Sequence, residues 1–396
     1  MKTVLKRAVL FLFSLCCLSL QGFAQQYRVH KTERTVRFTA DNVSVYNISN
    51  CVGGVFIARE SSKNVSYIID TLCNTLGAIY LKTGFGSFYP NFYGGNVATA
   101  VLGNGTPAVI NTKGEIVKQF PEGKKISTRF VDGVALLSVT NPKTYESLVV
   151  YINEKGEQIY KNLTMKDSMW GMNLDVSPLR DGLRRYYDSE KGMYGFIDEA
   201  GKVVISARFK KAHDFSDGLA AFTSNDGSIE YWGYVDTSGK EVIKPVFRNE
   251  PGDFHDGYAI VQKQNGKYVF IDKETNVKTK EFSRATRFFH GYALVNAQNQ
   301  YGDDYSKCYV VDTSFKRVRT IDFFAPGQMQ YNEYNNTFIM DDVVFNPDGV
   351  MKLNPTRPGS LMRDFIEDVA LYRCNEYTGL INSKGEVIMY FVQSEF

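Results

Sequence analysis

The sequence has no hydrophobic run long enough to cross a membrane. Its longest apolar segment, residues 8–20, holds about 13 residues, whereas a membrane-spanning helix needs about 20. It also lacks the nucleophile elbow G-x-S-x-G, the phosphate-binding P-loop and the zinc-binding H-E-x-x-H. With four histidines and no H-x-x-x-H spacing, the chain has no recognisable set of metal ligands. We therefore expect no membrane span, no metal, no cofactor and no enzymatic activity.

A net charge of one sign is absent as well. The chain has 46 Lys and Arg against 43 Asp and Glu, and three of the basic residues lie within residues 1–24. Without that segment the two totals are equal. Because binding to nucleic acid or to an anionic membrane needs an excess of basic residues, we expect neither partner.

The N-terminus has the organisation of a secretory signal. Lys2, Lys6 and Arg7 precede the apolar segment 8–20, and Gly22-Phe23-Ala24 offers small residues where a signal peptidase cleaves. This predicts a signal peptide over residues 1–24 and a mature chain of residues 25–396. We expect that chain to be exported, either to the periplasm or to the outside of the cell.

Cysteines are few, and two of the six lie in the signal segment. Cys51 and Cys73 each lie 11 residues from Ser62, the expected centre of a hairpin. Two residues that face each other across paired strands can form a disulfide in an oxidising compartment, so we predict a Cys51–Cys73 bridge. Cys308 and Cys374 have no evident reason to meet, and their pairing is left open.

What the sequence does contain is an internal repeat. A glycine opens the first strand of each unit, and successive opening glycines lie 34 to 49 residues apart. They are Gly54, Gly95, Gly133, Gly182, Gly218, Gly257 and Gly291. A last unit opens at Asp368, which leaves room for one degraded unit near residues 331–353. The sequence thus predicts about nine units.

Each unit carries a second mark, an Asp or Asn followed three residues later by Gly. The six copies begin at Asn111, Asn153, Asp198, Asp236, Asn346 and Asn382, and the acid alone is kept at Asp70, Asp272 and Asp312. An Asx side chain accepts a hydrogen bond from the backbone two residues on, and Gly adopts a positive φ. The pair therefore predicts a hairpin turn between antiparallel strands.

The segments beside these turns are short and rich in β-branched and aromatic residues, and no window of helical length has a 3.6-residue period. The fold class is therefore predicted to be all-β. A small residue recurs two places after the opening position, at Ala135, Ala220, Ala259, Ala293 and Ala370. Such crowding is typical of the inner strands of a propeller, so propeller-like closure is preferred, with an open β-hairpin solenoid as the alternative.

One stretch resembles a known family. Asp217-Gly218-Leu219-Ala220, then Trp232-Gly233-Tyr234-Val235-Asp236 and Gly239-Lys240, are similar to the WG-repeat family of bacterial proteins. Tyr194-Gly195-Phe196-Ile197-Asp198 is the next most similar copy. The resemblance is strong over residues 178–286 and weaker on either side. It implies an array of β units, often exported, with no catalytic residues to carry over.

A residue type that recurs in nearly every unit is better explained by the fold than by one active site, which removes the turn acids from the catalytic candidates. Local function is expected where the units differ. Four segments stand out: Phe85–Tyr93, residues 165–173 with Arg184 to Tyr187, residues 301–305 and residues 323–338. His213, His255 and His290 each lie within five residues before an opening glycine, so closure could bring two of them together.

Aromatic rings beside Asn, Ser and Gly can stack on sugars or hold a peptide, although most rings in a protein this aromatic serve packing. The candidate ligand-binding residues are Phe85, Phe88, Tyr89, Phe92, Tyr93, Tyr331 and Tyr334. Taken together, the sequence predicts an exported, non-catalytic binding or scaffold protein with an unknown protein or glycan partner. A glycan-binding module and, further off, a glycan or peptide hydrolase are the alternatives; the oligomeric state stays open.

Overall fold

The structure of the protein is a computed structural model. It describes residues 26–30, 38–41, 43–48, 54–60, 65–70, 74–81, 92, 96–121, 124–126, 128–140, 147–163, 165–166, 176–223, 230–299, 302–322, 330–332, 337–340, 343–345, 359–361, 369–374, 377–382 and 387–393. Within these ranges the chain forms strands and turns and no helix, which confirms the all-β prediction. The predicted signal segment and the Cys51–Cys73 bridge lie outside them. No helix in this part of the chain has the length and hydrophobicity to cross a membrane.

The described strands form nine antiparallel sheets, in agreement with about nine units. In chain order, the first four sheets contain β3 (Val43–Ile48), β4 (Val55–Glu60), β5 (Val65–Asp70) and β6 (Thr75–Tyr80); β7 (Val97–Val101), β8 (Pro107–Asn111) and β9 (Ile116–Gln119); β10 (Lys124–Ile126), β11 (Val134–Thr140), β12 (Ser147–Asn153), β13 (Gln158–Ile159) and β14 (Met165–Lys166); and β15 (Leu183–Asp188), β16 (Met193–Asp198) and β17 (Val203–Phe209).

The next four sheets contain β18 (Lys211–Ala212), β19 (Leu219–Thr223), β20 (Trp232–Asp236) and β21 (Glu241–Phe247); β22 (Ala259–Gln262) and β23 (Tyr268–Ile271); β24 (Tyr292–Asn299), β25 (Gly302–Asp312) and β26 (Arg317–Asp322); and β27 (Gln330–Asn332), β28 (Thr337–Met340) and β29 (Val343–Phe345). The ninth joins both ends of the chain: β30 (Gly359–Leu361), β31 (Val369–Cys374), β32 (Tyr377–Asn382) and β33 (Val387–Gln393) with β1 (Gln26–His30) and β2 (Phe38–Asp41).

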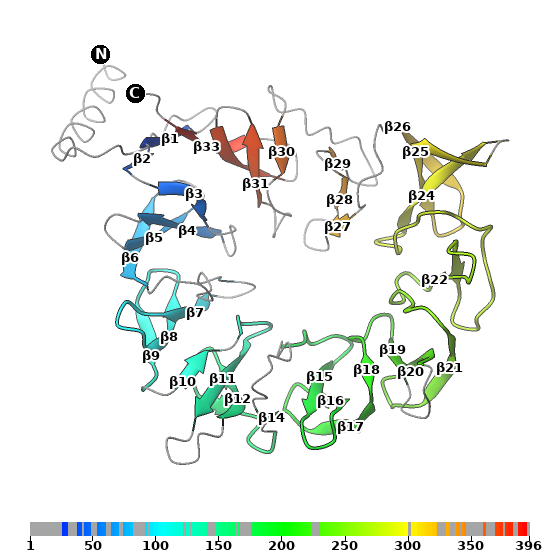
Figure 1. Ribbon diagram of the computed structural model, residues 1–396, viewed down its shortest axis with the longest axis horizontal. Coiled ribbons are helices and arrows are strands. Elements are labelled where there is room, and N and C mark those ends of the chain that lie inside the picture. Colours follow the sequence, from blue (N-terminus) through cyan, green and yellow to red (C-terminus); the bar gives the residue numbers. More distant parts are fainter. Residues whose placement is uncertain are drawn as a thin grey trace.

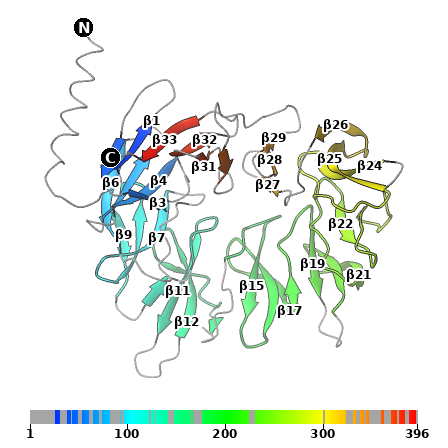
Figure 2. The same ribbon diagram turned by 45° about the horizontal axis from the view of Figure 1, so that its top comes forward.

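The units follow one another around a ring (Figures 1 and 2). Strands that are consecutive in the chain are neighbours in their sheet, except that β14 pairs with β12. Strands β9 and β17 lie farther from the centre of the ring than β7 and β15 (Figure 1). In the ninth sheet β1 pairs antiparallel with β33. This pairing is the contact that a closed ring requires. Propeller-like closure, preferred over the open solenoid, stays a prediction.

A two-residue turn precedes the first strand in several units, and we call it the tip. At the tip Asp217-Gly218 both residues have a positive φ, 55° and 78°. Ser216 and Leu219 exchange two backbone hydrogen bonds across it, as in a type I′ hairpin turn. Equivalent pairs stand at Asp132-Gly133, Asp181-Gly182, Asp256-Gly257 and His290-Gly291. The prediction that the opening glycines shape the backbone is confirmed at these five tips, and Gly95 lies outside the described residues.

The Asx–Gly turns follow the predicted chemistry. Oδ1 of Asp236 accepts hydrogen bonds from the backbone N–H groups of Ser238 and Lys240, at 3.0 and 2.9 Å, and Gly239 has a φ of 85°. At two turns that lack the glycine, Thr275 and Phe315 take a positive φ, 66° and 59°. The turn geometry is thus kept even where the residue is unfavourable for it.

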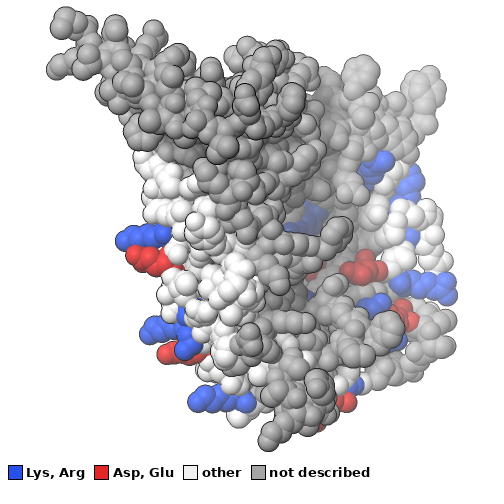
Figure 3. Space-filling model, turned by 60° about the vertical axis from the view of Figure 1, so that its left-hand side comes forward, with Lys and Arg blue, Asp and Glu red and all other residues white. Residues whose placement is uncertain are grey.

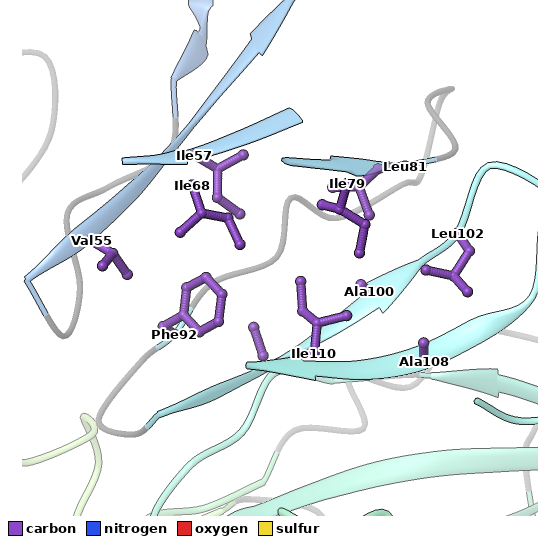
Figure 4. Close-up of a cluster of buried hydrophobic side chains, with 11 residues drawn as sticks. Val55, Ile57, Ile68, Ile79, Leu81, Phe92, Ala100, Leu102, Ala108 and Ile110 are labelled. Carbon is purple, nitrogen blue, oxygen red and sulfur yellow. The ribbon is translucent and has the colours of Figure 1, made fainter. Parts of the chain in front are cut away.

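Cores form between neighbouring units. One cluster joins Val55, Ile57 and Ile68 of the β3–β6 unit to Ala100 and Ile110 of the next (Figure 4). The crowded small-residue column is buried where its side chains are described: Ala135, Ala220, Ala259 and Ala293 are at most 1% exposed. Since each unit completes its neighbour's core, stability is shared along the array.

Candidate functional site

Of the seven predicted ligand-binding residues, the structure describes the surroundings of one. Phe92 is 2% exposed and packs in the core cluster of Figure 4, so this ring serves packing and we remove it from the candidate set. The backbone of Tyr331 lies in β27, opposite Phe338. Phe85, Phe88, Tyr89, Tyr93 and Tyr334 lie outside the described residues. Ligand binding by these six residues stays a prediction.

The unit with β15 differs from the others in its small-residue column. Arg184 stands two places after Gly182, where five other units have Ala, and it is 2% exposed. Its guanidinium donates hydrogen bonds to the carbonyl oxygens of Val131 and Asp132, at 3.4 and 3.5 Å, and to that of Ser177. A buried cation therefore joins this unit to the preceding one, at a segment where the sequence analysis expected the units to differ.

A polar cluster lies on the segments that lead to the tips of three successive units. Its centre is His213, whose Nδ1 lies 2.7 Å from Oδ1 of Asp253 and whose Nε2 lies 2.9 Å from Oε1 of Glu250. Arg287 approaches the other oxygen of Asp253 at 3.5 Å, and the His213 ring packs against Trp232 with centroids 5.1 Å apart. The cluster thus links residues that are up to 74 positions apart in sequence.

The charges in this cluster stabilise one another. Burial alone would lower the pKa of His213, but hydrogen bonds and charges from Asp253 and Glu250 outweigh it and raise this pKa above the ordinary 6.5. Burial would raise the pKa of Asp253, yet His213, Arg287 and His255 hold it below the ordinary 3.8. An imidazolium between two carboxylates is therefore the favoured state at mildly acidic pH.

His255 lies close enough to the same cluster for its charge to lower the pKa of Asp253. Both of its ring nitrogens lie 3.4 Å from Oγ of Ser216, so the hydroxyl is aligned with neither. Ser216 instead donates its O–H to the carbonyl oxygen of Phe254, at 2.6 Å. A nucleophilic serine needs a base directed at its hydroxyl, and this arrangement does not provide one.

Within the described residues, no group of three or more His, Cys, Asp or Glu side chains is placed to hold a metal ion. His213 shows why, since each of its ring nitrogens is directed at a carboxylate oxygen. Cys308 is buried as a free thiol, and burial raises its pKa. The cluster is accordingly suited to hold units together, or to meet a charged partner group, rather than to bind a metal.

Charged side chains of both signs lie beside one another on the face shown in Figure 3. This mixture agrees with the equal numbers of basic and acidic residues in residues 25–396.

Sequence reasoning missed one recurring feature of this region. Three residues before the opening glycine stands a phenylalanine, at Phe130, Phe215, Phe254 and Phe288, and each is at most 1% exposed. Its fixed spacing from the tip was a visible signal. Asp253 and Arg287 each stand one position before one of these phenylalanines. Their polar contacts had no such sequence signal, because the partner residues belong to other units.

No curated protein matches the chain. Solved structures that resemble it share little sequence: a eukaryotic initiation factor has 13% identity and a TM-score of 0.46, with 94% of this chain and 96% of that chain covered. BamB from Moraxella catarrhalis has 9% identity and a TM-score of 0.36, covering 93% and 99%. The C-terminal WD40 domain of Sif2 has 11% identity and a TM-score of 0.36, covering 80% and 95%.

A family model does match part of the chain, and the structure explains its signature. A Cβ atom on Gly233 would lie 2.5 Å from the carbonyl oxygen of Ile243, where β21 bulges over β20, and one on Gly195 would meet Ile205 in the same way. The dipeptide glycine is thus a steric requirement. Residues 194–227 and 232–268 match the family model described as "WG containing repeat", so this stretch of the chain is similar to that family.

Proposed function

We propose that this chain is an exported, repeat-based binding or scaffold protein that acts without catalysis. The observation that carries the proposal is that the residues common to the units have structural tasks. The Asx carboxylates and amides hold their own turns, and the tip acids bond the backbone of the following unit, as Asp181 does with Gly218. The residues that the units have in common therefore build a stiff array. The residues that differ between units are the candidates for binding a partner.

The array has two unlike rims. Leu219 pairs with Asp236, so the tip and the Asx turn of that unit lie at the same end of its sheet. The connection between first and second strands lies at the opposite end, and its length varies: it covers residues 224–231 in one unit and residues 189–192 in another. We expect a partner to bind this second rim, since loops of variable length on a rigid scaffold are common binding elements.

The test uses the mature chain, residues 25–396, immobilised and exposed to glycan arrays and to extracellular protein fractions. We expect at least one specific partner, with binding reduced when residues 224–231 are replaced by a Gly-Ser linker. A matched replacement of exposed residues on the tip side, such as Glu241→Ala, should leave binding intact. Turnover of a glycan or peptide that is lost in Asp253→Asn, with no stable partner, would instead support a hydrolase.

Export is tested separately. Cells that express the full chain should contain it outside the cytoplasm, shortened by residues 1–24, and deletion of those residues should retain it inside. Full-length protein found only in the cytoplasm would contradict this part of the proposal.

A further inference from the structure

A pocket of about 570 Å³ lies between the β7–β9 unit and the β10–β14 unit. Most of its lining is apolar and comes from Phe120, Leu137, Val139, Leu148, Val150 and Ile152. Binding sites for small molecules commonly have about 300–1,000 Å³ and a predominantly apolar lining with a few polar groups. The size and the surface of this pocket are those of a ligand site.

The pocket lies at a boundary where one large residue of the repeat is replaced by a smaller one. Between the β15–β17 and β18–β21 units the same region is filled by Phe209 and Phe222, whose ring centroids lie 5.0 Å apart. By strand register Leu137 takes the place of Phe222, since both stand four residues after an opening glycine. Phe120 takes the place of Phe209: its backbone N–H donates to the carbonyl oxygen of Pro107, the counterpart of Tyr194, with which Phe209 pairs.

The packing thins out toward one end of the pocket. Leu137, Val150 and Ile152 belong to the buried cluster that joins the two units. Val139 and Leu148 face each other at the end of the same hairpin, yet Leu148 is 42% exposed. Apolar surface left uncovered in this way is unfavourable in water and favours an apolar occupant.

Among the described residues that line the pocket, the polar ones are one cation and two amides, Lys118, Gln119 and Gln158, and none is an acid. The stem of Lys118 packs over Gly156, where a Cβ atom would lie 2.6 Å from its Cγ. In the described part of the chain Lys118 forms no ion pair. Its ammonium group is therefore available to an anion held beside an apolar surface.

We propose that this pocket binds a medium-chain alkyl carboxylate, with the chain against Leu137, Val139 and Leu148 and the carboxylate at Lys118. The aliphatic lining suits a flexible alkyl chain. The single cation among the described lining residues selects a negatively charged head group. This proposal does not rest on the proposed function.

Titration calorimetry of residues 25–396 with decanoate tests the site, with decanol and decyltrimethylammonium as head-group controls. We expect decanoate to bind one to one and at least tenfold more tightly than either control. Lys118→Met should weaken decanoate about tenfold and leave decanol unchanged, whereas Lys113→Met, a nearby exposed lysine outside the pocket, should change neither.

A filling variant makes the test independent of folding defects. Leu137→Phe restores the residue found at the boundary between the β15–β17 and β18–β21 units, so it should abolish decanoate binding while the melting temperature stays equal or rises. Decanoate binding that persists in both Leu137→Phe and Lys118→Met, or that is absent from the unchanged protein, would overturn the proposal.

Discussion

Oδ2 of Asp217 accepts a hydrogen bond of 2.6 Å from the backbone N–H of Gly257, the glycine of the next tip along the chain. Asp256 does the same with Gly291, at 2.8 Å. Each tip acid therefore has two tasks: it adopts the positive φ of its own turn and it bonds the backbone of the following unit. The sequence reveals the first task, because it is local, while the second follows from how the units are placed side by side.

Replacing Asp217 should separate these two tasks. Asp217→Ala removes the hydrogen bond to Gly257. It also puts an alanine, which has no polar side-chain group, at a φ of 55°. We expect a loss of about 1–3 kcal/mol in the free energy of unfolding. Asp217→Asn should lose less, because Asn tolerates this φ and its amide oxygen can still accept. Urea denaturation of both variants checks this; equal losses would show that the inter-unit bond contributes nothing.

Gly233→Ala should be more harmful than an alanine at a tip glycine. Gly233 has no room for a Cβ under the β21 bulge, whereas Gly257 has a φ of 85° and nothing within 4 Å of an added Cβ. We expect Gly257→Ala to cost about 1–2 kcal/mol through backbone strain. Gly233→Ala forces the two strands apart as well, at a cost typical of overpacking, a further 1–3 kcal/mol or so. Thermal melts that rank the two variants the other way would contradict this steric account of the dipeptide.

The contrast between turns and contacts shows how far the sequence could be read. The Asx turns, the tips and the number of units follow from the chemistry of a few adjacent residues, and they were predicted. The His213–Asp253 contact depends on which faces of two units meet, and neither residue carries that information. The prediction that Phe92 binds a ligand was wrong for a related reason. A ring among Gly, Ser and Asn has the same local sequence whether its side chain points into the core or toward solvent.

Thr275→Gly should stabilise the protein. Thr275 is exposed and holds a φ of 66° in a turn where other units have glycine, and a β-branched residue is unfavourable there. Relief of this strain outweighs the added freedom of glycine in the unfolded chain, so we expect a gain of up to about 1 kcal/mol. Thr237→Gly, an exposed threonine in the neighbouring Asx turn, is the matched control and should destabilise. A loss in both variants would refute the strain argument.

The His213 cluster should make stability depend on pH. The pKa of His213 is higher in the folded protein than its ordinary 6.5, so its contribution is fully present below that pH and is lost as the pH rises through the folded value. The pKa of Asp253 is lowered, so its contribution is present above its ordinary 3.8 and is lost as the pH falls through the folded value. The His213–Asp253 pair should therefore contribute most to the free energy of unfolding at pH values between the folded-state pKa of Asp253 and that of His213.

Denaturation of the unchanged protein, His213→Asn, Asp253→Asn and the double variant at several pH values checks this. The decline in stability on raising the pH above 6.5 should flatten in each single variant. The double variant should cost less than the sum of the two, since both remove one interaction. Additive losses, or an unchanged dependence of stability on pH in His213→Asn, would show that another group causes the pH dependence.

Closure of the ring can be tested through β1 and β33. Val29 pairs with Phe391 and Arg28 with Val392. Neighbouring pairs in an antiparallel ladder alternate between about 5.5 and 4.5 Å in Cα separation, so one of the two suits a disulfide better. A cysteine pair at the better position should oxidise within one molecule and raise the free energy of unfolding by about 2–5 kcal/mol, because it joins the two ends of the chain. In an open solenoid the first and last strands do not meet, and the same cysteines would then stay reduced or link two molecules, as a non-reducing gel would show.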